Sequence, residues 1–213
     1  MPAHLSIAYV LDPRFPGGTS AAVAAELRLA AGFGRISVHA VESSMFPGRT
    51  IAPVLEAAFD DLGIEPDWDA PVIAADLVIL HNPAFLKFQH AFGKRIICRH
   101  LLVVTHENFE RPGGEPGFDA ASCLQQIDRA ALALQKFIAP ISAANRSTLQ
   151  TWFAADGRRA GWQMMPDDWF NICAFDIAPP AAAPSDRRGR HSRPGYEKFP
   201  ALDDLDRCFP AHA

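Results

Sequence analysis

The stretch LSIAYVL, which spans Leu5–Leu11, is the clearest structural signal in the chain. It is short and continuously apolar, as is typical of a strand that is buried on both faces of a parallel sheet. The loop DPRFPGG follows at residues 12–18, and Thr19 or Ser20 can then cap a helix. A second apolar stretch, ISVHAV at residues 36–41, completes a unit of strand, helix and strand.

The same alternation continues through most of the chain. Four apolar residues recur on one face of a helix expected to begin near Asp119: Leu124, Ile127, Ala131 and Leu134. Further helices are expected over residues 51–62 and from Ser142 through Phe153, and strands over residues 75–80, 101–105, 136–141 and 168–175. Strands that alternate with helices in this way predict an α/β, Rossmann-like fold, with a mostly parallel sheet and helices on both faces.

Composition and charge exclude several classes of protein. The chain has 213 residues, 49% of them hydrophobic, and its net charge of -4 argues against a nucleic-acid-binding surface. The N-terminus lacks the basic region and apolar run of a secretory signal, so we expect a cytoplasmic protein. A peripheral contact with a membrane stays open, since Phe85, Leu86 and Phe88 could touch a membrane-bound acceptor or could form the core face of a helix.

The cysteines and histidines do not show the spacing of a metal site. Four cysteines lie far apart without a CxxC pair: Cys98, Cys123, Cys173 and Cys208. In the expected compartment they are interpreted as reduced thiols. Cys98, His100, His81 and His106 likewise lack a recognised ligand spacing, so no metal is expected.

The composition changes near residue 178. A linker of low complexity, APPAAAP, covers residues 178–184, and the basic run SDRRGRHSR follows at 185–193. We therefore expect a Rossmann-like domain over residues 1–177, and a linker with the truncated start of a second domain over residues 178–213.

Polar residues and glycines collect where the expected strands end. In an open α/β sheet the ligand sits outside the carboxyl ends of the strands. Candidate ligand-binding residues at this edge are Gly17, Gly18, Thr19, His81, Asn82, His106, Glu107 and Asn108.

The order of these segments carries a resemblance to a known family. The relevant stretches are DPRFPGGTS after the first strand, the strand ends HNPAF and VTHENF, the later IAPIS, and GRHSRPGYEKFP after the proline-rich linker. Together they resemble GT-B glycosyltransferases, and most closely the bacterial enzymes grouped with family four. The resemblance implies that this chain is the N-terminal, acceptor-side half of a GT-B fold.

The resemblance also implies roles for individual residues. A histidine facing the sugar cleft matches His106, the candidate catalytic residue, which would hydrogen-bond the transferred sugar or the acceptor hydroxyl. Its ordinary pKa would allow proton transfer near neutral pH. A Gly-Arg pair and a later lysine that contact the donor diphosphate match Arg190 and Lys198. The family needs no metal or resident cofactor, because its donor substrate is a nucleotide-sugar.

Each candidate also has a purely structural interpretation. Gly17 and Gly18 could let the backbone approach a ligand at the following helix N-terminus, or could simply form a tight turn. Asn82 could line the acceptor pocket or make the turn before Pro83. Glu107 could accept hydrogen bonds from a hydroxyl or form an exposed salt bridge. Arg14 and Arg111 could hold an anionic acceptor or remain solvated loop charges.

The leading hypothesis is a fragment of a glycosyltransferase that moves a sugar from a nucleotide-sugar to an acceptor hydroxyl, for example on a saccharide. The family's paired acidic motif has no counterpart here, so the isolated chain is expected to show little turnover. One alternative is a non-catalytic Rossmann-like binding or assembly module that docks a separate donor-binding domain or chain. Another is a GT-B-like sugar-nucleotide epimerase.

Overall fold

The computed structural model describes residues 5–109, 115, 117, 119–155 and 161–172. Its elements follow one another as β1 (Leu5–Leu11), α1 (Gly18–Ala30), β2 (Gly34–Ala40), α2 (Pro53–Leu62), β3 (Val72–His81), the short 3-10 helix η1 (Pro83–Leu86), β4 (Arg95–Thr105), α3 (Ala120–Ala130), β5 (Ala131–Pro140), α4 (Ala143–Ala155) and β6 (Trp162–Met164). All of these residues belong to the first of two units in the chain, Met1–Ala174. The second unit, Phe175–Ala213, lies outside the described residues, so the boundary expected after residue 177 stays a prediction.

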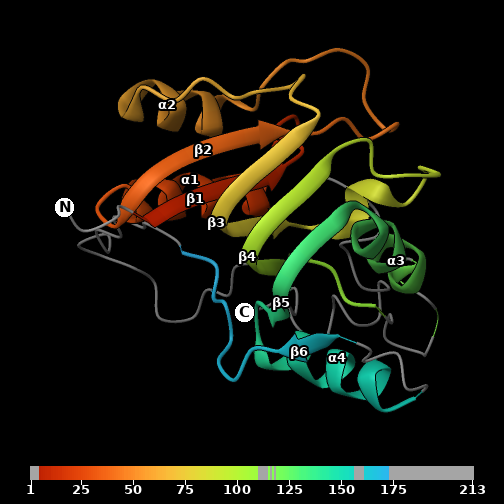
Figure 1. The fold of residues 1–213 in the computed structure, drawn as a ribbon. Helices are drawn as coiled ribbons and strands as arrows, with labels where there is room; N and C mark the ends of the chain where they lie inside the picture. The colour runs from red at the N-terminus through yellow and green to blue at the C-terminus, as the bar shows by residue number, and fades with distance from the viewer. Residues whose placement is uncertain (1–4, 110–114, 116, 118, 156–160, 173–213) are drawn as a thin grey trace, which may run out of the picture. The chain divides into compact units, whose positions relative to one another are not determined.

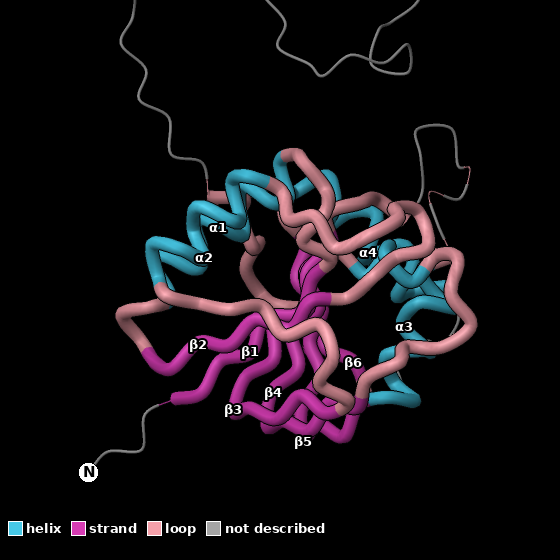
Figure 2. The backbone as a smooth tube through the Cα atoms, turned by 90° about the horizontal axis from the view of Figure 1, so that it is seen from above, coloured by secondary structure: helices cyan, strands magenta, loops and turns pink. Residues whose placement is uncertain are grey.

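One sheet organises the described domain. Its six strands run in the order β2-β1-β3-β4-β5-β6, and every neighbouring pair is parallel. Helices α1 and α2 lie beside β1 and β2, whereas α3 and α4 lie toward the β6 end (Figures 1 and 2). The expected α/β, Rossmann-like fold with a parallel sheet is confirmed.

Alternate residues of the strands enter two separate cores. Ile7, Tyr9 and Leu11 of β1 pack with side chains of α1 and α2. Ala8 and Val10, which point the other way, pack with side chains of η1, α3 and α4. Because successive residues of a strand face opposite sides, a continuously apolar strand such as β1 can serve both cores. Helices therefore cover both faces of the sheet, as the sequence predicts.

Two expected elements are wrong in type or position. Ala131 and Leu134 lie in β5 and not on a helix, because α3 ends at Ala130 and the chain pairs with β4 from Ala131 onward. Their helical spacing is also compatible with a strand, and Leu134 is 81% exposed. The described part of the strand expected over 168–175 is irregular, and the last described strand is β6 instead. Pairing with β4 explains why Ala131 and Leu134 are in a strand, since a local sequence pattern does not reveal such a distant partner.

Gly34 marks the closest backbone approach at the start of the sheet. It pairs with Leu5, and a Cβ atom at this position would collide with the Leu5 carbonyl oxygen. We expect Gly34→Ala to lower the free energy of unfolding by about 1–3 kcal/mol, since two paired backbones must separate. Urea denaturation measures this change. Gly18→Ala is the control, because a Cβ there has no neighbour within 4 Å; an equal loss in both variants would contradict the explanation.

Candidate functional site

The carboxyl ends of β1, β3 and β4 form the candidate site. The chain places β2 on one side of β1 and β3 on the other, which is the arrangement that opens a crevice between the following loops in doubly wound sheets. His81 is the last residue of β3, and His106 directly follows β4. The backbone N–H of Asn82 donates to the Val104 carbonyl oxygen over 2.9 Å, which keeps these two strand ends level.

Three side chains form a line at this edge, which we call the relay: the buried Glu26 and His81 and the partly buried His106. Nδ1 of His81 lies 3.0 Å from Nε2 of His106, at hydrogen-bond distance. On the opposite side of the same ring, Nε2 of His81 faces Oε1 of Glu26 at 3.5 Å. His81 is 2% exposed and Glu26 is 8% exposed. A carboxylate, an imidazole and a second imidazole are therefore in series.

The geometry assigns the protons of the two rings. Since Nε2 of His81 faces the Glu26 carboxylate, we place a proton on that nitrogen. Nδ1 of His81 then accepts a hydrogen bond from Nε2–H of His106. Nδ1 of His106 keeps its lone pair, and this atom is buried without a hydrogen-bond partner among the described residues. The relay thus ends in an unused acceptor.

Glu26 is held in its charged form by its neighbours. Burial by itself raises the pKa of this carboxyl group, but His81, the indole of Trp169 and the hydroxyl of Tyr9 together lower the pKa below its ordinary value. The Trp169 Nε1–H donates to Oε2 of Glu26 over 2.8 Å. Burial, and then the charge of Glu26, raise the pKa of Tyr9, so its hydroxyl stays protonated. The ring of Tyr9 also stacks on His81 with the two planes 6° apart.

His106 does not titrate near neutral pH, so this part of the sequence-based expectation is wrong. Burial, and next the positive charge that His81 can carry, lower the pKa of His106 to about 3. The nearby Glu26 opposes this effect only in part. At neutral pH the ring is therefore uncharged, and the two imidazoles together hold no more than one extra proton.

The other strand-end residues have structural partners. Asn82 adopts a left-handed backbone conformation with φ of 55°, and its side chain caps η1 by accepting from the Ala84 N–H. These contacts agree with the interpretation that Asn82 forms the turn before Pro83. Glu107 forms a salt bridge with Lys87 at 3.0 Å. Oδ1 of Asn108 accepts from Nδ2 of Asn145, a buried residue of α4.

Gly17, Gly18 and Thr19 form the N-terminal end of α1. Gly17 has an extended backbone, so no left-handed conformation requires a glycine at this position. The first helical hydrogen bond runs from the Ala21 N–H to the Gly17 carbonyl oxygen. The N–H groups before Ala21 therefore lack partners within the helix. Gly17 and Gly18 are exposed, whereas Ser20 is buried. Glu26 lies on the same helix, about 12 Å farther along its axis.

Arg14 is neither a solvated charge nor an anion-binding residue. It is 6% exposed and pairs with Asp12 over 2.7 Å. Its remaining N–H groups donate to the carbonyl oxygens of Ser43, Phe46 and Gly48. Arg14 thus ties the loop after β2 to the loop after β1.

Some sequence-based candidates lie outside the described residues, and others are placed away from the relay. Arg111, Arg190 and Lys198 fall in the first group. Phe85 and Leu86 are buried in the core, whereas Phe88 is 67% exposed. Within the described part of the chain, no group of three or more His, Cys, Asp or Glu side chains could hold a metal ion. None of its helices has the length and apolar character needed to cross a bilayer.

The sequence reasoning missed Glu26, Tyr9 and Trp169. A signal existed for Glu26, because it lies three residues after Val23 and one before Leu27, on the apolar side of an otherwise amphipathic helix. An acidic residue at such a position needs a buried partner.

Comparisons of the chain with models of known protein families, with curated proteins and with solved structures find no match.

Proposed function

We propose that this domain binds the hydroxyl-bearing acceptor of a glycosyl transfer, with one acceptor hydroxyl donating a hydrogen bond to Nδ1 of His106. The observation that carries the proposal is the buried, unpartnered Nδ1 at the end of the relay. A buried acceptor without a partner is unfavourable by about 1–3 kcal/mol, and a ligand hydroxyl would remove that penalty. The family resemblance supports a saccharide as the source of the hydroxyl.

The relay can also accept the proton of that hydroxyl. Nδ1 of His106 takes the proton while the His106 Nε2–H proton passes to Nδ1 of His81 across their 3.0 Å contact. The positive charge then resides on His81, next to the carboxylate of Glu26. No imidazolium has to form on His106, whose pKa of about 3 disfavours it. In this proposal Glu26 and His81 supply the basicity, and His106 supplies the contact with substrate.

The donor in this proposal is a nucleotide-sugar. Arg190 and Lys198 are proposed to contact its diphosphate, since an Arg fork and a Lys point charge stabilise the negative charge that grows as a diphosphate departs. The N–H groups at the start of α1 offer a further place for anionic or hydroxyl oxygens. Gly17, Gly18 and Thr19 are therefore proposed as substrate-binding residues together with His81, Asn82, Glu107 and Asn108.

The test follows the two imidazoles of the relay by 15N NMR while maltose, lactose and methyl α-mannoside are added as acceptors. We expect at least one of them to shift the Nδ1 signal of His106. His106→Gln should weaken that sugar's binding about tenfold, the equivalent of one hydrogen bond of about 1.4 kcal/mol. Because His106 is uncharged above its pKa of about 3, protonation of His106 itself should not change the affinity between pH 5 and 8.

Gly18→Ala separates binding from folding in the same experiment. The substitution leaves the backbone unstrained and meets no neighbour, so stability should be unchanged. If the acceptor approaches the start of α1, the added methyl group weakens binding. Acceptors that leave the His106 signals unmoved, or an affinity that rises as His106 is protonated, would sink the proposal.

A further inference from the structure

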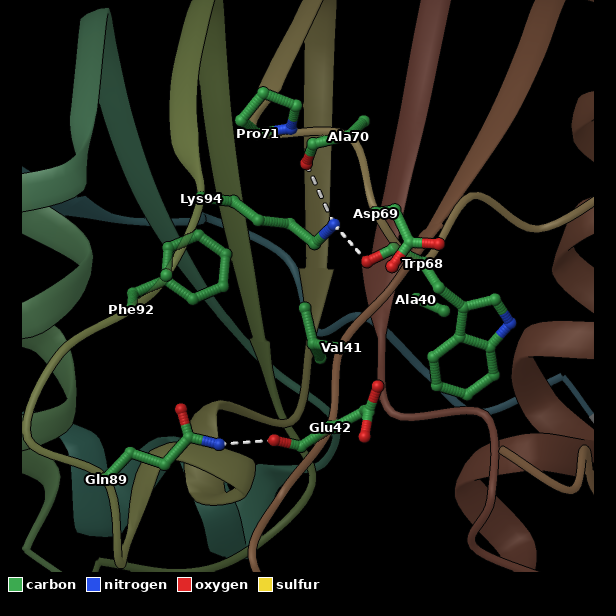
Figure 3. Close-up of a pocket in the computed structure, with 11 residues that line it drawn as sticks. Ala40, Val41, Glu42, Trp68, Asp69, Ala70, Pro71, Gln89, Phe92 and Lys94 are labelled. Carbon is green, nitrogen blue, oxygen red and sulfur yellow. Dashed lines mark hydrogen bonds between the residues drawn. The ribbon is translucent and has the colours of Figure 1, made fainter. Parts of the chain in front are cut away.

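A pocket in the described domain contains no residue of the relay in its lining. Its volume is about 320 Å³, and it opens where the loop after β2 meets the segments that lead into β3 and β4. Figure 3 shows Lys94 and Phe92 on one side of it, Trp68 and Asp69 on the other, and Glu42 and Gln89 below. The complete lining is Ala40, Val41, Glu42, Trp68, Asp69, Ala70, Pro71, Gln89, Phe92, Gly93 and Lys94. A pocket of this size is at the lower end of the range for small-molecule sites, so it suits one small ring.

The positive charge in the pocket is fixed in position. Lys94 is 9% exposed, and its Nζ donates to the carbonyl oxygens of Trp68 over 2.7 Å and Ala70 over 2.9 Å. These two bonds are drawn in Figure 3. An ammonium group has three N–H donors, so one remains for a ligand.

A second cation, Arg49, pairs with two of the carboxylates around the pocket. Arg49 binds Glu42 over 2.8 Å and Asp69 over 2.7 Å. With Lys94 and the nearby Asp67, the site therefore has two positive and three negative side chains and a net charge of -1. An anionic ligand would meet two carboxylates, and a cationic ligand would meet a lysine and an arginine. Because a charged ligand of either sign would meet side chains of like charge, the site favours an uncharged ligand that both donates and accepts hydrogen bonds.

Some polar atoms of the pocket are not used in contacts within the protein, and they include both hydrogen-bond donors and acceptors. Oε1 of Glu42 is used by Arg49, whereas no described residue bonds Oε2. The side-chain N–H of Gln89 donates to the Glu42 backbone carbonyl, and the amide oxygen of Gln89 has no partner among the described residues. Together with the third N–H of Lys94, they offer two acceptors and one donor.

The walls between these polar atoms are apolar. Trp68 and Phe92 contribute aromatic rings, and Val41 lies between them in Figure 3. Hydroxyl groups at the edge of a ring and C–H groups on its face would match this alternation of polar atoms and aromatic walls.

We propose that this pocket binds the ring of an uncharged sugar, with Trp68 against the ring face and Lys94, Glu42 and Gln89 on its hydroxyl groups. This goes beyond the proposed function, because the pocket would hold a monosaccharide unit whether or not His106 contacts an acceptor. It identifies the domain as a carbohydrate-binding one on evidence that is separate from the relay.

The test titrates the protein with the methyl β-glycosides of glucose and galactose and with methyl α-mannoside, up to 100 mM, and follows side-chain N–H signals by NMR. At least one glycoside should shift both the indole N–H of Trp68 and the amide N–H of Gln89. Trp68→Ala and Gln89→Ala should each weaken that binding about tenfold, the effect of losing about 1.4 kcal/mol of contact energy. Two variants are used so that a folding defect in one does not decide the result.

His106→Gln is the matched control, and it should leave the shifts at Trp68 and Gln89 unchanged. Loss of those shifts in the control would mean that the sugar binds at the relay and would overturn the separate pocket. The absence of any shift at 100 mM would do the same. So would stronger shifts with phenylalanine as a zwitterionic probe, since that ligand would use the charged side chains as separate partners.

Discussion

Acidification from pH 6.5 to pH 3 should cost the folded chain roughly 4 kcal/mol through His106 alone. In the unfolded chain this imidazole binds a proton near pH 6.5, but in the folded chain burial and His81 lower its pKa to about 3. Between these values the unfolded state holds one more proton than the folded state. Stability therefore falls as the pH falls, by about 1.4 kcal/mol for each pH unit.

Glu26 acts in the same direction. Its folded-state pKa is lowered, so the stability that it contributes is present at neutral pH and is lost as the pH falls through that lowered value. It adds to the acid sensitivity at the low end of the range and does not offset the contribution of His106.

Urea denaturation at several pH values between 6.5 and 4.5 measures this dependence. His106→Gln should remove about 1.4 kcal/mol per pH unit from the slope, while the glutamine amide can still donate to Nδ1 of His81. His90→Gln is the matched control, because His90 is exposed and should leave the slope as it is. A slope that is the same in His106→Gln and in the unchanged protein would refute the buried, uncharged assignment of His106.

Arg14→Met should lower the free energy of unfolding by about 3–5 kcal/mol. The substitution preserves much of the side-chain volume but leaves Asp12 buried without its 2.7 Å partner. It also removes the donors that hold the carbonyl oxygens of Ser43, Phe46 and Gly48. The loss is large because an unpaired buried carboxylate retains its desolvation penalty when the compensating charge is gone.

The double variant Asp12→Asn with Arg14→Met tests this cause. It removes the uncompensated charge, so it should be more stable than Arg14→Met alone. Arg28→Met is the surface control, since Arg28 and Asp61 form an exposed pair and the loss should be at most about 1 kcal/mol. If Arg14→Met and Arg28→Met lowered the free energy of unfolding by comparable amounts, Arg14 would not stabilise the loop after β2.

The strands that the sequence predicted best are those with continuous apolar runs. Ile7–Leu11 of β1 and the end of β4 are buried against both cores, so their pattern needs no knowledge of neighbours. The first half of β5 failed because its residues are partly exposed and their spacing fits a helix equally well. Its pairing with β4 in register Ile96 to Ala131 is a contact between distant parts of the chain.

The candidate site also combines features that the sequence predicts with features that only the tertiary structure shows. The sequence by itself determined that His81 and His106 follow strands, and hence that both lie at the carboxyl edge of a parallel sheet. Only the tertiary structure decided that Nδ1 of His81 lies 3.0 Å from Nε2 of His106, and that Glu26 reaches His81 from α1. It also decided that His106 is uncharged and that Arg14 joins the loop after β2 to the loop after β1. The reason is physical: a residue's place along a strand is local information, whereas pKa values and ion pairs depend on burial and on charges that distant segments bring together.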